Sequence, residues 1–154
     1  MSYIQQLLAN RILITGLVGW AVAQVVKTVL YAIVNRTLNF ERLVGDGGMP
    51  SAHSATVSSV ALSTGFEMGF NSAVFAVALI LAIIVMHDAM GVRRESGRHA
   101  SAINELWDAL TFTNADYENL SPDEQLKEFI GHSPTQVVAG CVLGIVIACI
   151  SYLL

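Results

Sequence analysis

Three short segments of the chain gather residue types that handle phosphate. They cover residues 47–54 (Gly-Gly-Met-Pro-Ser-Ala-His-Ser), 88–94 (Asp-Ala-Met-Gly-Val-Arg-Arg) and 131–136 (Gly-His-Ser-Pro-Thr-Gln). In two of them serine and proline stand where a helix begins, and the free N–H groups and positive dipole end of a helix N-terminus attract anions. The remaining segment supplies two neighbouring arginines. Together the three segments predict a phosphate-binding site.

Two histidines in these segments can supply the chemistry. One imidazole can attack phosphorus while the other donates a proton to the leaving oxygen, and arginines can hold the remaining oxygens as charge develops. His53 and His132 are the candidates, and the scheme needs neither a metal ion nor a cofactor. The alternative is structural: His53 would hydrogen-bond the loop before its helix, and His132 would end a short helix that stops at Gly131.

The composition is typical of a membrane protein. Hydrophobic residues make up 54% of the 154 residues and charged residues 13%, where soluble domains average about 25% charged. The mean hydropathy is +0.59. These values exclude a disordered chain and an ordinary soluble globule. Because the net charge of -4 provides no basic field for nucleic acid, we expect membrane lipids as surroundings and no nucleic-acid partner.

Apolar stretches predict an all-α, multi-pass transmembrane helical bundle of about four membrane helices, in a single domain over residues 1–154. About 20 mostly apolar residues are needed to cross a bilayer as a helix. Gln24 and Lys27 interrupt the first stretch, and the second is rich in small residues, which places it inside the bundle. The predicted spans cover about residues 12–34, 51–68, 72–90 and 134–154.

The remaining hydrophilic sequence predicts a polar loop over residues 93–130, with a short cytoplasmic helix that begins at Ser121 and stops at Gly131. In the last span, Gly140 and Gly144 form a small-xxx-small pair suited to close helix packing. The small-residue faces of the second and fourth spans also make a homodimer a reasonable expectation.

The basic residues predict the orientation of the chain. Four spans place the loop before residue 50 and the loop after residue 92 on one face, and positive charge concentrates in cytoplasmic loops. We therefore expect the three motif segments at the cytoplasmic face of an inner membrane of bacterial type. Six of the eight basic residues lie on this face: Arg36, Arg42, Arg93, Arg94, Arg98 and Lys127.

The motifs carry a family resemblance. Residues 50–53 (Pro-Ser-Ala-His) resemble the Pro-Ser-Gly-His motif of the type 2 phosphatidic acid phosphatase superfamily, which includes the vanadium haloperoxidases. Residues 131–140 resemble its third motif, in which a histidine precedes Pro-Thr-Asp and an Ala-Gly helix. The order of all three segments is similar to a divergent branch of small membrane proteins related to acid phosphatases and haloperoxidases, over nearly the whole chain.

The resemblance implies roles for individual residues. His132 matches the nucleophile that forms a phosphohistidine, and His53 matches the acid that protonates the leaving group. Ser51 matches the serine whose hydroxyl and backbone bind phosphate, and Lys27 stands for the lysine of the first motif. The implied substrate is a lipid phosphate.

The carboxylate that orients the nucleophile in this superfamily is replaced here. The position four residues after His132 holds Gln136, and an amide can hold an imidazole through its oxygen but cannot stabilise an imidazolium as a carboxylate does. Asp88 and Glu128 are the candidates for a substitute carboxylate. An alternative for these two, with Asp46, is to hold a divalent cation, although we expect no metal.

The superfamily's phosphate-binding arginine is also displaced, because its place falls at Leu126. Arg93 or Arg94 can replace it from the end of the third span, with Asp88 as a salt-bridge partner. The alternative for both arginines is to anchor a helix end at the membrane surface.

These inferences predict a membrane lipid-phosphate phosphatase, acting on a phosphatidate or an isoprenoid phosphate through a phosphohistidine intermediate. The alternative is a non-catalytic lipid-phosphate binding or transport protein that keeps the pocket without turnover, and Gln136 motivates it. A purely structural membrane subunit is the third interpretation.

Overall fold

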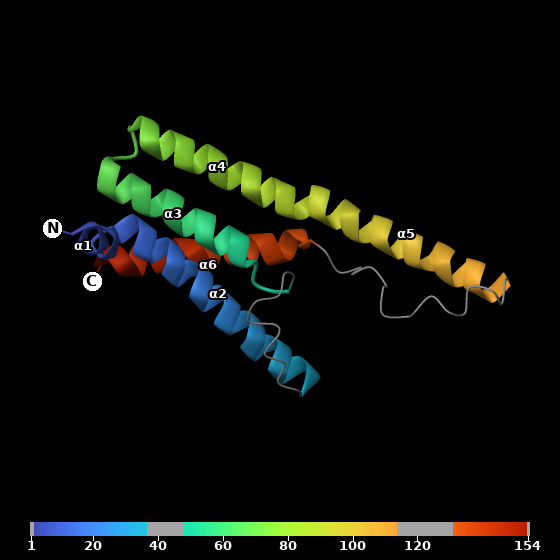
Figure 1. The fold of residues 1–154 in the computed structure, drawn as a ribbon. Coiled ribbons are helices and arrows are strands. Elements are labelled where there is room, and N and C mark those ends of the chain that lie inside the picture. The colour runs from blue at the N-terminus through green and yellow to red at the C-terminus, as the bar shows by residue number, and fades with distance from the viewer. Residues whose placement is uncertain (1, 37–47, 114–130, 154) are drawn as a thin grey trace.

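The computed structural model describes residues 2–36, 48–113 and 131–153. These residues form helices and no strand, which confirms the all-α prediction. Figure 1 shows α3 in the middle of the bundle, with α5 continuing α4 beyond it. The helices are α1 (Tyr3–Leu8), α2 (Arg11–Asn35), α3 (Ala52–Met68), α4 (Ala73–Met90), α5 (Val92–Thr113) and α6 (Pro134–Leu153).

Three helical stretches of the described residues are long and apolar enough to cross a membrane. They are α2, α6 and the run of α4 into α5 as far as Trp107. The second expected span corresponds to α3, which has 17 residues and is therefore roughly 26 Å long at 1.5 Å per residue. This helix packs against α2, α4 and α6, so its small side chains lie inside the bundle, as the sequence predicts.

The glycines of α6 permit its close approach to α3. A Cβ atom on Gly144 would collide with Ser58 Oγ and with the backbone carbonyl of Ala55, and a Cβ on Gly140 would collide with the carbonyl of Ser51. The hydroxyl of Ser58 also donates to the Cys141 carbonyl of α6 at 3.2 Å. The predicted small-xxx-small pair is therefore the contact between α6 and the central helix.

The substitution Gly144→Ala should destabilise the bundle. The added methyl must displace the backbone of α3, and overpacking of this kind costs about 1–3 kcal/mol of unfolding free energy. Thermal unfolding of the purified protein in detergent, followed by circular dichroism, measures the effect. Val142→Ile is the matched control, because it adds one carbon to a residue of α6 whose side chain is 54% exposed. Equal unfolding midpoints for the two variants would contradict the proposed contact.

A polar cluster joins three helices at the end of the bundle that lies near both termini (Figure 1). Tyr152 donates a hydrogen bond to Glu67 Oε1 at 2.8 Å, and the guanidinium of Arg11 lies 4.3 Å from the centre of the Tyr152 ring. Thr15 Oγ1 and Ser151 Oγ are 3.0 Å apart. These contacts link α2, α3 and α6, and no local pattern in the sequence predicts them.

The prediction of a polar loop over residues 93–130 is wrong for residues 93–113, because the helix α5 occupies them. The helix is amphipathic: Ala100 and Asn104, four residues apart, are buried, while Arg98 and Glu95 form an exposed ion pair at 2.6 Å. In the sequence, the helical spacing of the apolar residues Ile103, Leu106 and Trp107 is the signal that the polar composition obscured. The short helix expected from Ser121 lies outside the described residues.

Candidate functional site

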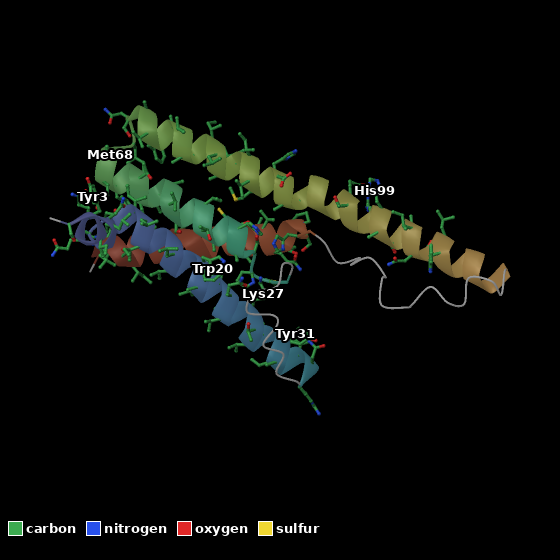
Figure 2. The ribbon with its side chains drawn as sticks, in the orientation of Figure 1. Tyr3, Trp20, Lys27, Tyr31, Met68 and His99 are labelled. Carbon is green, nitrogen blue, oxygen red and sulfur yellow. The ribbon has the colours of Figure 1, made fainter. Side chains whose placement is uncertain are left out.

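A pocket of about 290 Å³ lies where α2, α3 and α4 meet the segment that leads into α6. Lys27 lies on the part of α2 beside the start of α3 (Figure 2). The pocket is lined by Trp20, Gln24, Lys27, Ala52, His53, Thr56, Val57, Val85 and His132. It therefore contains residues from two of the predicted motifs and from the first membrane helix.

The two candidate catalytic histidines are neighbours in this pocket. The ring centroids of His53 and His132 are 5.8 Å apart, with an angle of 60° between the ring planes. His53 lies in the first turn of α3, and His132, which is 3% exposed, lies two residues before α6. Rings whose centroids are this close are in edge-to-face contact, so both imidazoles border the same part of the pocket.

His132 is fixed by hydrogen bonds on both its backbone and its ring. Its N–H donates to the carbonyl of Ala89, near the end of α4, at 3.0 Å. Its Nδ1 lies 3.2 Å from Gln136 Oε1, and the same oxygen accepts the N–H of Ser133 at 3.0 Å. Because the amide oxygen can only accept, Nδ1 carries the hydrogen and Nε2 keeps its lone pair. This is the tautomer that a nucleophilic imidazole needs.

Gln136 has a second role at the start of α6. Its backbone N–H lies 3.4 Å from Ser133 Oγ, and its side-chain oxygen accepts the Ser133 N–H, so the two residues form a capping box. The residue that caps α6 therefore also orients His132. Because an amide is neutral, it holds the imidazole without stabilising a positive charge on it.

Ser51 connects the starts of α3 and α6. It is fully buried, its Oγ accepts the N–H of Ser54 at 3.3 Å, and its own N–H donates to the carbonyl of Gln136 at 3.0 Å. Ser51 thus caps α3 and is not among the residues that line the pocket. Its contact with phosphate stays a prediction.

Lys27 is buried, with an exposed fraction of 4%. Its aliphatic stem packs against Gly48, where an added Cβ would lie 3.1 Å from Lys27 Cγ and where φ is +90°. The glycine therefore makes room for the lysine. Lys27 also borders a second, mostly apolar pocket of about 210 Å³, which is lined by Leu30, Tyr31, Val34, Asn35, Gly48 and Met49 as well.

Several predicted site residues are not brought into the pocket by the described structure. Arg93 and Arg94 lie in the first turn of α5, and their side chains are outside what is described, as is Glu128. Asp88 is half-buried on α4, beside Ala89, and does not line the pocket. The phosphate-binding arginine and the substitute carboxylate remain predictions.

The alternative that carboxylates hold a divalent cation requires a cluster of metal ligands. In the part of the chain that the structure describes, no three His, Cys, Asp or Glu side chains lie close enough together to hold a metal ion. Asp46 and Glu128, which the alternative requires, lie outside the described residues, so it is not tested.

Gln24 is a pocket residue that lies outside the three predicted motif segments. It is 7% exposed, it lines the pocket with both histidines, and it lies one helical turn before Lys27 on α2. Its Oε1 has no hydrogen-bond partner among the described residues. The available signal was a polar residue inside an apolar span at i, i+3 from a lysine.

The chain matches one family model and one known bacterial relative. The model of the "Divergent PAP2 family" matches residues 8–147, which include both histidines and most of the membrane helices. The chain belongs to this family. It is also 39% identical over 148 residues to the uncharacterized membrane protein YuiD of Bacillus subtilis (strain 168), which covers 92% of this chain and 94% of the relative. No solved structure matches.

Membership of the divergent PAP2 family confirms the resemblance that the motif order indicated, and the YuiD match supports an integral membrane protein. The name of the relative assigns no activity.

Proposed function

We propose that this divergent PAP2 protein is a membrane phosphatase that hydrolyses a lipid phosphate monoester of the phosphatidate or isoprenoid phosphate type. The observation that carries the proposal is the pairing of His53 and His132, whose ring centroids are 5.8 Å apart, in one pocket with Lys27. Two imidazoles and a cation are the groups that metal-free phosphoryl transfer through a covalent intermediate requires.

The reaction would take place in two steps. Nε2 of His132 attacks phosphorus, a P–N bond forms, the P–O bond to the lipid breaks, and His53 gives its proton to the departing oxygen. A water molecule then attacks phosphorus, the P–N bond breaks, and His53 accepts a proton from the water as inorganic phosphate leaves. Lys27 offsets the negative charge of the phosphoryl group in both steps.

The surroundings of the pocket favour a lipid over a soluble phosphate. Two of the helical stretches that line the pocket, α2 and α4, are long and apolar enough to cross a membrane. Lys27 also lines the apolar pocket that includes Leu30, Val34 and Met49, so the first carbons of an apolar chain can lie there while the phosphate is beside the histidines.

A non-catalytic lipid-phosphate binder or carrier is the second candidate. The observation that favours it is the contact of Gln136 Oε1 with His132 Nδ1 at 3.2 Å, where a carboxylate would stabilise the imidazolium-like charge of a phosphohistidine. A neutral partner leaves the intermediate less stable and turnover slower.

The two candidates differ in phosphate release. The purified full chain, reconstituted in lipid, would be incubated with a phosphatidate and with an isoprenyl phosphate, and released inorganic phosphate would be measured. Release that increases with protein concentration and stops on addition of vanadate supports the phosphatase. Saturable binding of either lipid with no release on long incubation would exclude it and favour the binder.

We also propose that the pocket faces the cytoplasm, because the basic residues concentrate at this end of the helices. In a background with Cys141→Ala and Cys149→Ala, a cysteine at the exposed position Asn35 should react with a membrane-impermeant maleimide only after permeabilisation. A cysteine at the exposed position Asn71, in the turn between α3 and α4, should react in intact cells. The opposite pattern would reverse the orientation.

A further inference from the structure

The pocket that holds the two histidines has a buried polar end and an open apolar end. At the polar end, Lys27 and His132 are 4% and 3% exposed. At the other end, Trp20 is 46% exposed, and Val57 and Val85 are half-buried. All five residues line the same cavity of about 290 Å³. A molecule with a charged head and an apolar chain fits a cavity of this kind.

The open end lies in a gap between two membrane helices. The helix α3 packs against both α2 and α4, but in the described part of the chain α2 and α4 do not pack against each other. Figure 1 shows them on either side of α3. Trp20 of α2 and Val85 of α4 both line the cavity, so α3 forms the floor of the gap. Because α2 and α4 are long and apolar enough to cross a membrane, the gap opens toward the hydrocarbon of the bilayer.

Trp20 lies inside a membrane span, far from either end of its helix. Tryptophan concentrates at the two membrane–water interfaces, but Trp20 is nine residues from the start of α2 and fifteen from its end. A Cβ atom on the neighbouring Gly19 would collide with Ser59 Oγ, so this part of α2 lies against the second turn of α3. The indole is therefore placed beside the gap at the level of the membrane interior.

The separation of Trp20 from the polar end sets a length. Trp20 comes seven residues before Lys27 on α2 (Figure 2), which is roughly 10 Å along the helix. An extended alkyl chain of about eight carbons covers that length. A chain that starts from a phosphate beside the histidines would therefore reach the indole only when it is about this long.

We propose that the gap between α2 and α4 holds the alkyl chain of the bound phosphate ester, and that Trp20 makes the site prefer chains of about eight carbons or more. The phosphate lies beside the histidines and Lys27, and the chain runs over α3 to the indole. The inference rests on the proposed function for the phosphate end of the ligand, but it requires no turnover.

The smaller pocket beside Leu30 is the competing place for the chain. It lies beyond Lys27 toward the end of α2, and neither histidine lines it. The gap belongs to the cavity that holds both histidines and leads toward the middle of the span. The gap therefore suits the long part of the chain better than the smaller pocket does.

The test is equilibrium binding of n-alkyl phosphonates, from ethyl to dodecyl, to the purified full chain in detergent, by calorimetry. A phosphonate has no P–O bond to an alkyl leaving group, so binding is measured without hydrolysis. The affinity of the wild type should rise about twofold to fourfold per carbon as far as about eight carbons, and little beyond. Trp20→Ala should leave ethyl phosphonate binding unchanged and weaken the binding of octyl and longer phosphonates about tenfold. Comparison with the wild type at each chain length cancels the partition of the chain into detergent.

Trp107→Ala is the matched control, because this other tryptophan is 42% exposed on α5 and does not line the cavity. It should leave the whole series unchanged. Trp20→Phe keeps an aromatic ring and should retain most of the dependence on chain length. Ethyl phosphonate is an internal check, since a misfolded variant would lose it too.

Three results would overturn the proposal. The first is a wild-type affinity that does not rise with chain length. The second is a Trp20→Ala series that is unchanged, or equally weakened at every length while circular dichroism shows intact helices. The third is a loss of the chain-length dependence in Leu30→Ala instead, which would place the chain in the smaller pocket.

The outcomes also separate this inference from the proposed function. The expected binding series without hydrolysis of any lipid phosphate would leave the role of Trp20 standing and exclude the phosphatase. Hydrolysis that depends on His132, together with a series that Trp20→Ala does not alter, would exclude the role of Trp20 alone. A wild type that binds no phosphonate would contradict both.

Discussion

The substitution His132→Ala should reduce the hydrolysis of a lipid phosphate monoester by at least about 10⁴-fold in kcat, because it removes the atom that forms the covalent bond to phosphorus. The hydrogen bond between its Nδ1 and Gln136 at 3.2 Å presents Nε2 as the nucleophile. Phosphate release at several protein concentrations measures the loss.

The control for this variant is His87→Ala, which removes an exposed histidine of α4 that does not line the pocket. It should retain the wild-type rate. Circular dichroism would show whether both variants keep their helices. Turnover by His132→Ala within about tenfold of the wild type, with His87→Ala unchanged, would exclude a phosphohistidine at His132.

The substitution His53→Ala should have the second largest effect, and its size should depend on the leaving group. General acid catalysis contributes about 10²–10⁴-fold, and an alkoxide needs the proton far more than an acidic phenol does. We therefore expect kcat/KM to fall about 10²–10⁴-fold for an alkyl lipid phosphate and less than about tenfold for an aryl phosphate with an acidic phenol. The parameter kcat/KM is the correct readout, because it reports the step in which the leaving group departs.

A different pattern would assign a different role to His53. Equal losses on the alkyl and aryl substrates would show that its imidazole binds the phosphoryl group instead of protonating the leaving oxygen. The distance of 5.8 Å between the ring centroids places both imidazoles beside the same part of the pocket, so the dependence on the leaving group decides between these roles.

Local patterns in the sequence were sufficient to predict the helices and their closest contact. Apolar runs predicted α2, α4 and α6, and the spacing of Gly140 and Gly144 predicted the approach of α6 to another helix. Ser133 and Pro134 predicted the start of α6. Each of these features depends on residues within about one turn of each other or on a continuous run, and such signals are present in the sequence itself.

Features that depend on packing could not be predicted in the same way. The order of the chain does not show that Arg11 stacks on Tyr152, because 140 intervening residues can fold in many ways. Gly48 belongs to a segment that the sequence assigned to the phosphate site, but its contact is with the stem of Lys27. Gln24 was recognised only as a polar interruption, since an unsatisfied amide becomes visible only when its surroundings are known.

The helix α5 was missed for a local reason. Gly91 has the sequence signature of a helix end, and the charged residues after it resemble a surface loop. The structure shows that α4 ends at this glycine while a second helix begins at the next residue. The apolar residues Ile103, Leu106 and Trp107 repeat with helical spacing in the sequence, and weighing that period above the composition would have predicted the helix.

The most direct test of the central claim is to trap the phosphoenzyme. The wild-type protein would be mixed with a lipid phosphate labelled at phosphorus, quenched in alkali, where a P–N bond survives, and mapped by peptide mass spectrometry. We predict label on His132, its loss on acid treatment, and no label in His132→Ala. Hydrolysis that proceeds with no label on His132, or with label on another residue, would contradict the mechanism.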